Sequence, residues 1–354
     1  MGPRPVRVLI VDDSALVREI LATGLNSDPG IEVVGTATDP FNARDKILQL
    51  KPDVMTLDVE MPKMDGVEFL HQLMPQHPIP VIMVSALTER GRKITLEALE
   101  FGAVDFVTKP KSDVANGLQK MMQVLAAKVK MAATANVSHW KRRQRSEPPA
   151  QRQARPLTAS TNQVIVIGAS TGGTEAIREV LSRLPVNTPG VVITQHMPGG
   201  FTNMFAQRMD EISAMQVREA QDGDSVIPGR VLIAPGGMHM SIVRSGGSYR
   251  VKCQDGPKVN GHKPSVEVLM KSAATALGRH AIGVMLTGMG GDGAQGLLAM
   301  RQAGARTLAQ DEATSVVFGM PRVAWECGAA EKLVPLQNIA DTVVKWLNRK
   351  EELV

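Results

Sequence analysis

The sequence repeats one pattern: a short, almost entirely apolar run followed by an amphipathic segment of helical length. In the first third of the chain these runs lie at 6–11, 31–37, 53–59, 80–86 and 105–110. Apolar runs that alternate with amphipathic helices are typical of a parallel sheet with helices on both faces. We therefore predict that residues 5–125 form a doubly wound α/β domain.

The same pattern returns after residue 160. The apolar runs of this second block lie at 163–170, 190–198, 280–288 and 306–311. Residues 231–243 and 248–254, with Ser-Gly-Gly between them, are expected to form an antiparallel hairpin. We therefore predict a second doubly wound domain at 161–350, a Rossmann-like α/β fold with an antiparallel hairpin.

Residues 126–160 are expected to form a linker between the two domains, helical at first and then basic and flexible. Within it, residues 139–156 contain six Arg or Lys, one Glu and three Pro. This stretch accounts for the net charge of +5, so the charge of the remainder is balanced. A basic linker could contact acidic surfaces or RNA, or it could be a solvated tether. The balance elsewhere argues against a nucleic-acid-binding protein.

Composition and the termini indicate where such a chain works. The two cysteines, Cys253 and Cys327, are too few for a disulfide framework and lack the spacing of a metal site. The first residues lack the apolar core of a signal peptide. No apolar run approaches the ~18–20 residues that span a bilayer. We expect a soluble, cytoplasmic protein with no direct membrane insertion.

Polar side chains stand at the ends of four of the first five apolar runs. The first run ends in Asp12 and Asp13, the third in Asp58, the fourth in Ser85 and the fifth in Lys109. Because sites form at the carboxyl ends of parallel strands, we expect these groups to meet at one edge. Converging carboxylates suit Mg²⁺, and a lysine beside one of them would stabilise an incoming phosphoryl group. Taken singly, an aspartate here could cap a helix and Lys109 could be a surface residue. The Lys109–Pro110 bond is a candidate cis peptide.

These residues, with Asp58 in LDVEMPKMDG, resemble those of response-regulator receiver domains. The resemblance implies a flavodoxin-like fold and phosphorylation of Asp58 by a histidine kinase. It implies that Mg²⁺ is the cofactor of this domain, bound by the side chains of Asp12, Asp13 and Asp58 and the backbone carbonyl of Glu60. It also implies three switch residues, Ser85, Phe106 and Lys109, although Phe106 could equally be a core residue.

In the second block, Ser170 stands in Gly-Ala-Ser-Thr-Gly, between an apolar run and a helical segment. A serine on such a tight strand-to-helix turn exposes its hydroxyl, and the helix N-terminus favours a developing oxyanion. A dinucleotide-binding loop would need Gly at position 170, and the Gly-Lys-Ser/Thr of a Walker loop is absent. A nucleophilic serine and a purely structural turn remain as the two interpretations.

A nucleophilic serine needs a base and a group that orients the base. His196 follows the apolar residues VVITQ (191–195) within the run 190–198, at the predicted edge that holds Ser170, and His239 is its rival. Asp292, in LTGMGGDGAQG, is the best orienting acid, although it could be a helix N-cap. Weaker candidates for that acid are Asp222, Asp224 and Asp311. We assign a triad of Ser170, His196 and Asp292, with oxyanion donors in the backbone N–H groups of Met289 and of Thr171 or Gly172.

The strings GASTGG, TQHMP, APGGMHM, NGHKPSV, LTGMGGDGA and FGMP resemble the catalytic domain of the CheB family of chemotaxis protein-glutamate methylesterases. This resemblance implies hydrolysis of glutamyl methyl esters on the cytoplasmic domains of chemoreceptors, with release of methanol. It also implies deamidation of receptor glutamines, a catalytic domain without a cofactor, and a receiver that covers the catalytic face until it is phosphorylated. We expect the protein to be a monomer.

Two alternatives come from other functional classes. The first is a DNA-binding response regulator, against which stand the long α/β pattern of the second block and its balanced charge. The second is a docking module without catalytic activity, which only an activity measurement excludes.

Overall fold

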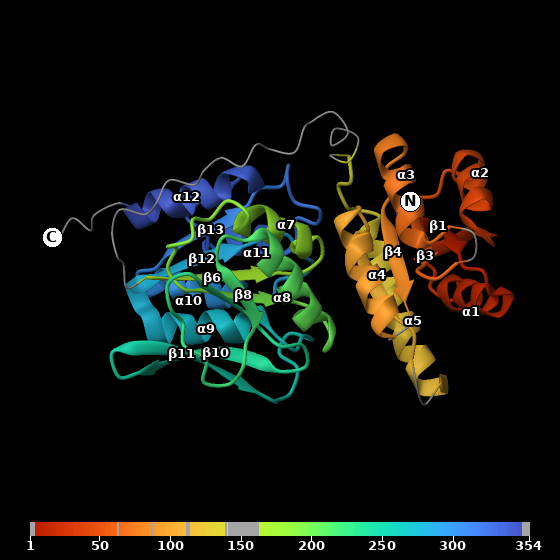
Figure 1. Cartoon of the computed structure of the whole chain (residues 1–354). Helices are drawn as coiled ribbons and strands as arrows, with labels where there is room; N and C mark the ends of the chain where they lie inside the picture. The colour runs from red at the N-terminus through yellow and green to blue at the C-terminus, as the bar shows by residue number, and fades with distance from the viewer. Residues whose placement is uncertain are drawn as a thin grey trace. The chain divides into compact units, whose positions relative to one another are not determined.

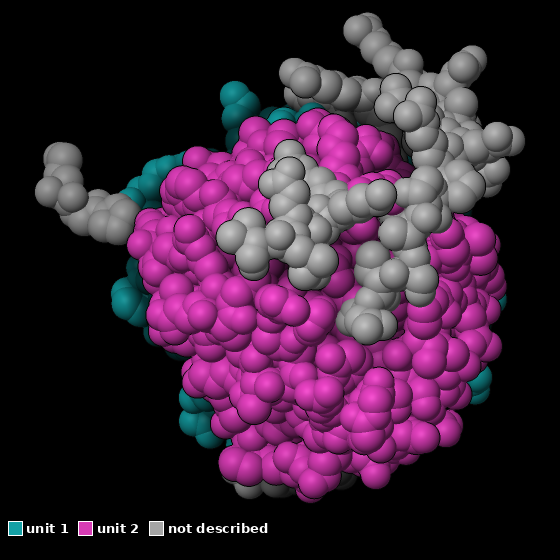
Figure 2. Space-filling model, turned by 90° about the vertical axis from the view of Figure 1, so that its left-hand side faces the viewer, with its two compact units in different colours: residues 1–148 teal, residues 149–354 magenta. Residues whose placement is uncertain are grey.

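The computed structural model describes residues 4–61, 64–85, 88–110, 114–138, 140 and 163–348. The chain divides into two compact units, Met1–Pro148 and Pro149–Val354, which Figure 2 colours teal and magenta. The basic part of the expected linker, residues 141–160, lies outside the described residues, and the linker boundaries stay a prediction. Of the helices that are described, none has the length and apolar character needed to cross a membrane.

The first unit is a five-stranded parallel sheet with the strand order β2-β1-β3-β4-β5 (Figure 1). Its strands are β1 (Val6–Val11), β2 (Ile31–Ala37), β3 (Val54–Asp58), β4 (Val81–Ser85) and β5 (Asp105–Thr108). Its helices are α1 (Ala15–Asn26), α2 (Pro40–Leu50), α3 (Gly66–Gln76), α4 (Glu89–Glu100) and α5 (Val114–Ala132). This strand order is the flavodoxin-like one, so the expected fold is confirmed.

Short-range signals in the sequence explain where four of these helices begin. The N-cap residues of α1 to α4 are Ser14, Asp39, Asp65 and Thr88, whose side chains each accept a hydrogen bond from the backbone N–H three residues later. The strands β3 and β4 are buried along their whole length, because helices cover both faces of the sheet.

The second unit contains a seven-stranded sheet with the order β14-β13-β12-β6-β7-β9-β8, in which every pair is parallel. Its strands are β6 (Val164–Ala169), β7 (Val191–Gln195), β8 (Gln216–Glu219), β9 (Arg230–Ile233), β12 (Ala281–Met285), β13 (Arg306–Gln310) and β14 (Leu333–Val334). Its helices are α7 (Gly173–Leu181), α8 (Phe201–Ile212), α9 (Val266–Leu277), η1 (Gly278–His280), α10 (Ala294–Gln302), α11 (Met320–Glu326) and α12 (Leu336–Asn348). The expected α/β class is confirmed for this unit too.

A separate antiparallel hairpin, β10 (His239–Ser245) and β11 (Ser248–Gln254), packs against α9 (Figure 1). The hairpin was expected, but its first strand was not expected to begin so late. Residues 230–233 belong to β9 in the parallel sheet, and Pro235-Gly236-Gly237 ends that run before β10 starts. The expectation of a single strand over 231–243 is therefore wrong.

The expected cis peptide bond at Lys109–Pro110 is not observed, because this bond is trans. Among the described residues, the cis peptide bond is Lys263–Pro264. The Lys109 side chain nevertheless reaches the acidic edge of the first sheet from a trans bond, as described below.

The strand order of the second unit determines where a site can form. β6 pairs with β7 on one side and with β12 on the other. After β6 the chain adds β7, β8 and β9 on one side of β6. It later returns to the other side and adds β12, β13 and β14 there. In open parallel sheets, ligands bind at such a switch point, outside the carboxyl ends of the strands.

Candidate active site and acidic cluster

Ser170 lies directly after β6, at this switch point and at the N-terminus of α7. Its backbone N–H donates to Thr287 O at 3.0 Å, and its carbonyl accepts from Gly173 N at 2.8 Å and Gln195 Nε2 at 2.8 Å. Gly172 has φ of +75°, a left-handed conformation that L side chains rarely adopt. The serine is therefore held on a tight, hydrogen-bonded turn between a buried strand and a helix.

His196 and Asp292 form a hydrogen-bonded pair at the same edge. His196 Nε2 lies 2.8 Å from Asp292 Oδ2, and the two side chains are 8% and 1% exposed. The backbone N–H of His196 donates to Ala169 O at 3.1 Å, next to the serine. Its Nδ1 is buried and has no hydrogen-bond partner within the described part of the chain. Nδ1 is therefore the ring atom available to accept a proton.

Gln195 links the segments that hold the serine and the histidine. Its Nε2 donates to Ser170 O at 2.8 Å and to His196 O at 3.3 Å. Gln195 is itself only 4% exposed. The sequence does not indicate this role for Gln195, because a polar residue at the end of an apolar strand is ordinary.

Asp292 is surrounded by donors. Its Oδ1 accepts from Asn260 Nδ2 at 2.9 Å and Ser265 Oγ at 2.8 Å, and its Oδ2 accepts from Val266 N at 2.7 Å in addition to His196. Burial alone would raise the pKa of Asp292, but the hydrogen bonds and the His196 charge outweigh it and lower the pKa to about 2. Asp292 is thus a carboxylate at any pH near neutrality.

The alternative roles for these residues do not fit the geometry. Asp292 does not cap the helix that follows it, because the N-cap of α10 is Gly293 without a side-chain bond. The rival His239 has both ring nitrogens engaged with backbone, Nε2 with Pro257 O at 2.8 Å and Nδ1 with Ser265 N at 3.3 Å. The weaker acids accept backbone N–H bonds in other turns, Asp222 from Cys253, Asp224 from Gln221 and Asp311 from Thr314.

The loop after β12 brings Gly288, the residue before Met289, close to Ser170. A Cβ atom added to Gly288 would lie 2.7 Å from the Ser170 Cβ, so this backbone runs against the serine. The Met289 N–H donates to no acceptor in the described residues, and its side chain is 42% exposed. Thr171 is buried, and its carbonyl accepts from Thr287 Oγ1 at 3.0 Å.

His262 is a neighbour of this pair to which sequence reasoning assigned no role. Its ring lies parallel to that of His196, with centroids 3.7 Å apart and an interplanar angle of 7°. Asn260 and Ser265, which bind Asp292, come from the same loop. The NGHKPS string was noticed in the sequence, but nothing in its spacing places it over the ends of strands β7 and β12.

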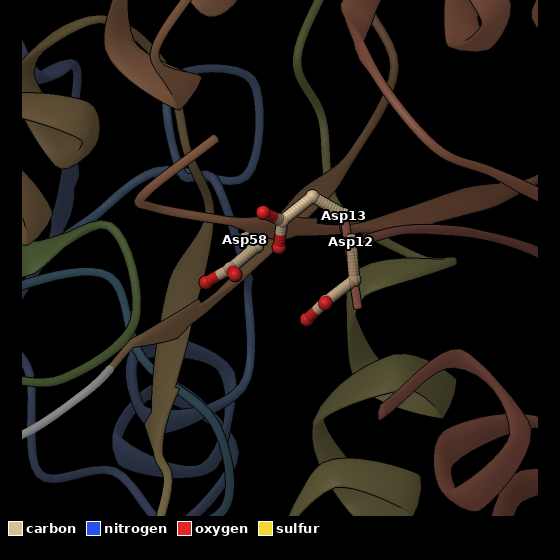
Figure 3. A group of neighbouring side chains, drawn as sticks. All are labelled: Asp12, Asp13 and Asp58. Carbon is tan, nitrogen blue, oxygen red and sulfur yellow. The ribbon is translucent and has the colours of Figure 1, made fainter. Parts of the chain in front are cut away.

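The first unit has a separate cluster of carboxylates at the carboxyl ends of its strands. Ligand oxygens of Asp12, Asp13 and Asp58 all lie within 4.8 Å of one another. Figure 3 shows the three side chains together, two from the end of β1 and one from β3. Oxygen donors this close suit a hard cation such as Mg²⁺. Glu60, the fourth expected contributor, is exposed just beyond β3.

Lys109 lies between two of these carboxylates, with Nζ 3.1 Å from Asp12 Oδ2 and 3.1 Å from Asp58 Oδ2. Burial raises the pKa of Asp58 to about 6, because Lys109 offsets the lost hydration only in part and the Asp12 charge adds to the shift. Burial also opposes the charge of Lys109, but Asp58 and Asp12 outweigh it and raise its pKa. The positive charge of Lys109 therefore offsets the negative charge of the cluster only in part.

The other two expected switch residues lie on β4 and β5. Ser85 is fully buried, and its hydroxyl accepts from Thr95 Oγ1 of α4 at 2.7 Å. Phe106 is 6% exposed, and Lys128 Nζ lies 5.5 Å from its ring centroid. Burial is what a core phenylalanine shows, so the structure leaves both interpretations of Phe106 in place.

Comparison with known proteins places the chain. A family model described as CheB methylesterase matches residues 165–343, and one described as response regulator receiver domain matches residues 8–122. The chain belongs to the CheB methylesterase family. This confirms both resemblances seen in the sequence.

Relatives that match this CheB-family chain over nearly their whole length are named as both a methylesterase and a glutaminase. The chain is 60% identical to a protein-glutamate methylesterase/protein-glutamine glutaminase of Syntrophotalea carbinolica, over 98% of this chain and 99% of that protein. It is 54% identical to protein-glutamate methylesterase/protein-glutamine glutaminase 1 of Xanthomonas campestris pv. campestris, over 96% and 97%. The crystal structure of the Thermotoga maritima CheB methylesterase catalytic domain is 37% identical, with a TM-score of 0.51, and it aligns with 53% of this chain and 100% of that domain.

Proposed function

We propose that this chain hydrolyses glutamyl methyl esters on the cytoplasmic domains of chemoreceptors, releasing methanol, and that it deamidates receptor glutamines. The observation on which this rests most is the His196–Asp292 pair beside the Ser170 turn, at the switch point of the second sheet. Membership of the CheB methylesterase family and the names of the relatives support the substrate class.

In this mechanism the Ser170 hydroxyl oxygen attacks the γ-carbonyl carbon of the ester. His196 accepts the hydroxyl proton at Nδ1, since Nε2 is committed to Asp292, and returns it to the departing methanol or, in deamidation, ammonia. Asp292 orients the ring and stabilises its charged form. The acyl-enzyme is then hydrolysed by a water that gives its proton to His196. His196 returns this proton to the Ser170 oxygen as the acyl bond breaks, which leaves a free glutamate and restores Ser170.

Stabilisation of the tetrahedral oxyanion is assigned to backbone donors. We propose the N–H groups of Met289 and Thr171 for this role, with the N-terminal end of α7 adding a favourable dipole. The proximity of Gly288 to Ser170 supports the assignment of Met289.

The first unit is proposed to control this reaction. Asp58 would accept a phosphoryl group from a chemotaxis histidine kinase, beside Lys109 as a fixed positive charge. The residues that would hold Mg²⁺ are Asp12, Asp13, Asp58 and, through its carbonyl, Glu60. When bound, the ion would neutralise the carboxylates and the incoming phosphoryl oxygens. Ser85 would then hydrogen-bond the new phosphate, with Phe106 as the second switch residue.

The esterase assignment is tested by methanol release from methylated receptor membranes. Ser170→Ala should abolish nearly all release, because Ser170 supplies the attacking oxygen in the proposed mechanism. Ser182→Ala, an exposed serine at the far end of α7, is the matched control and should behave as wild type. Near-normal release by a folded Ser170→Ala protein would refute the assignment.

A further inference from the structure

The imidazole of His196 is held at one point by its hydrogen bond to Asp292. A single bond at Nε2 fixes the distance to the carboxylate but leaves the ring able to tilt and swing about its Cβ–Cγ bond. Nδ1 makes no bond among the described residues that would stop this motion. A catalytic base must nevertheless meet the serine proton within hydrogen-bond reach and in line.

A second ring supplies the missing constraint. The His262 imidazole lies 3.7 Å from that of His196, centroid to centroid, and within 7° of parallel. At this separation the two rings are in van der Waals contact over their faces, so tilting the His196 ring toward His262 is blocked. We propose that His262 is a positioning residue, which holds the base in the orientation that keeps Nε2 on Asp292 and leaves Nδ1 for Ser170.

The segment that contains His262 is built around the same site. Val259 and His262 exchange backbone hydrogen bonds of 3.0 and 2.9 Å, which closes a tight turn. Within it, Asn260 donates to Asp292 Oδ1 at 2.9 Å, and beyond it Ser265 donates to the same oxygen at 2.8 Å. The loop is thus attached to the acid on both sides of His262, and the stacked ring is fixed relative to the base–acid pair.

The loop is also anchored away from the site. Lys263 Nζ lies 2.6 Å from Asp255 Oδ1 and 3.1 Å from the Gly256 carbonyl. His239 Nε2, at the start of β10, forms a hydrogen bond with Pro257 O, just before the same turn. Since these contacts hold the backbone without the His262 side chain, replacement of that side chain removes the stack and keeps the loop.

This inference rests on the proposed function, and its test uses the full-length chain and methylated receptor membranes. Three variants are compared: His262→Ala, which removes the ring; His262→Phe, which keeps a flat ring over His196; and Lys258→Ala, an exposed control on the same loop. We expect His262→Ala to lower kcat by roughly ten- to a hundredfold, the size of effect caused by a misplaced catalytic group, with KM within about twofold. His262→Phe should recover most of the lost kcat, and Lys258→Ala should match wild type.

Three results would overturn the proposal: unchanged kcat in His262→Ala, an effect confined to KM, or a His262→Phe variant as slow as His262→Ala. Thermal unfolding of each variant separates a loss of positioning from a loss of fold, because the positioning account requires the kcat loss in folded protein. If wild type releases methanol through Ser170 while His262→Ala is normal, only this inference fails. If wild type shows no Ser170-dependent release, the proposed function itself fails and this proposal fails with it.

Discussion

Two buried aspartates in this chain have pKa values shifted in opposite directions, and the donors around each explain why. Asp292 accepts four hydrogen bonds and has a pKa of about 2. Asp58 accepts from Val59 N and pairs with Lys109, but burial and the nearby Asp12 charge raise its pKa to about 6. The first is suited to remain a permanent charge beside His196, and the second lies in a cluster suited to a cation, where the proposed function places the phosphoryl group.

The raised pKa of Asp58 predicts a pH-dependent stability. A carboxyl group whose pKa is about 6 in the folded chain and 3.8 when unfolded favours the folded state fully below pH 3.8, and this contribution is lost as the pH rises through 6. Asp58→Asn keeps a neutral side chain at every pH. The variant should therefore raise the free energy of unfolding of the first unit above pH 6, and the gain should vanish toward pH 4.

Denaturant unfolding of the full chain without Mg²⁺, at a series of pH values, checks this expectation. Asp45→Asn, on the exposed part of α2, serves as the control for removal of a negative charge. A gain for Asp58→Asn that is the same at pH 4 and pH 8 would contradict the account.

Among residues, position at a strand end is what allowed the proximity of these side chains to be predicted. Ser170, His196 and Asp292 each follow an apolar run, and parallel strands bring such positions together. His262, Asn260 and Ser265 follow a hairpin that lies outside the parallel sheet, so their return to the site depends on tertiary packing of that hairpin on α9. No periodicity or spacing in the sequence predicts that packing.

At the scale of elements, apolar runs identified the central strands and missed the peripheral ones. β6, β7, β12 and β13 were all expected, because each is buried on both faces and reads as a continuous apolar run. β8 has the sequence Gln-Val-Arg-Glu and β14 has two residues, so neither shows such a run. Strand order in the second unit was likewise beyond the sequence.

The close approach of the β12 loop to the serine turn yields a prediction at this scale. A methyl group at Gly288 would lie 2.3 Å from Met320 Sδ and 2.7 Å from Ser170 Cβ, so Gly288→Ala must displace one of these neighbours. Movement of the serine by about 1 Å costs on the order of a hundredfold in rate. We expect Gly288→Ala to lower kcat for methanol release by about ten- to a hundredfold.

The matched control is Gly247→Ala in the turn between β10 and β11, where an added Cβ has open space. It should leave the rate unchanged. If Gly288→Ala were as active as Gly247→Ala, the loop after β12 would have no part in placing the nucleophile.

At the scale of the whole molecule, the chain joins two parallel-sheet units that each place their polar groups at the carboxyl ends of the strands. The first unit has a carboxylate cluster whose negative charge is offset by Lys109 only in part. The second unit has the His196–Asp292 pair next to the Ser170 turn. We propose that phosphorylation of Asp58 in the first unit controls ester hydrolysis in the second. The ratio of the rates measured on the same substrate with and without phosphodonor gives the size of this control.

The most direct measurement is the rate of methanol release from methylated receptor membranes with and without acetyl phosphate. It is made for the full chain, for Asp58→Ala and for a fragment that begins at residue 155. We predict that phosphodonor raises the rate of the full chain toward that of the fragment, while Asp58→Ala keeps the basal rate and does not respond. Equal rates for the unphosphorylated chain and the fragment, with no response to phosphodonor, would contradict control by the first unit.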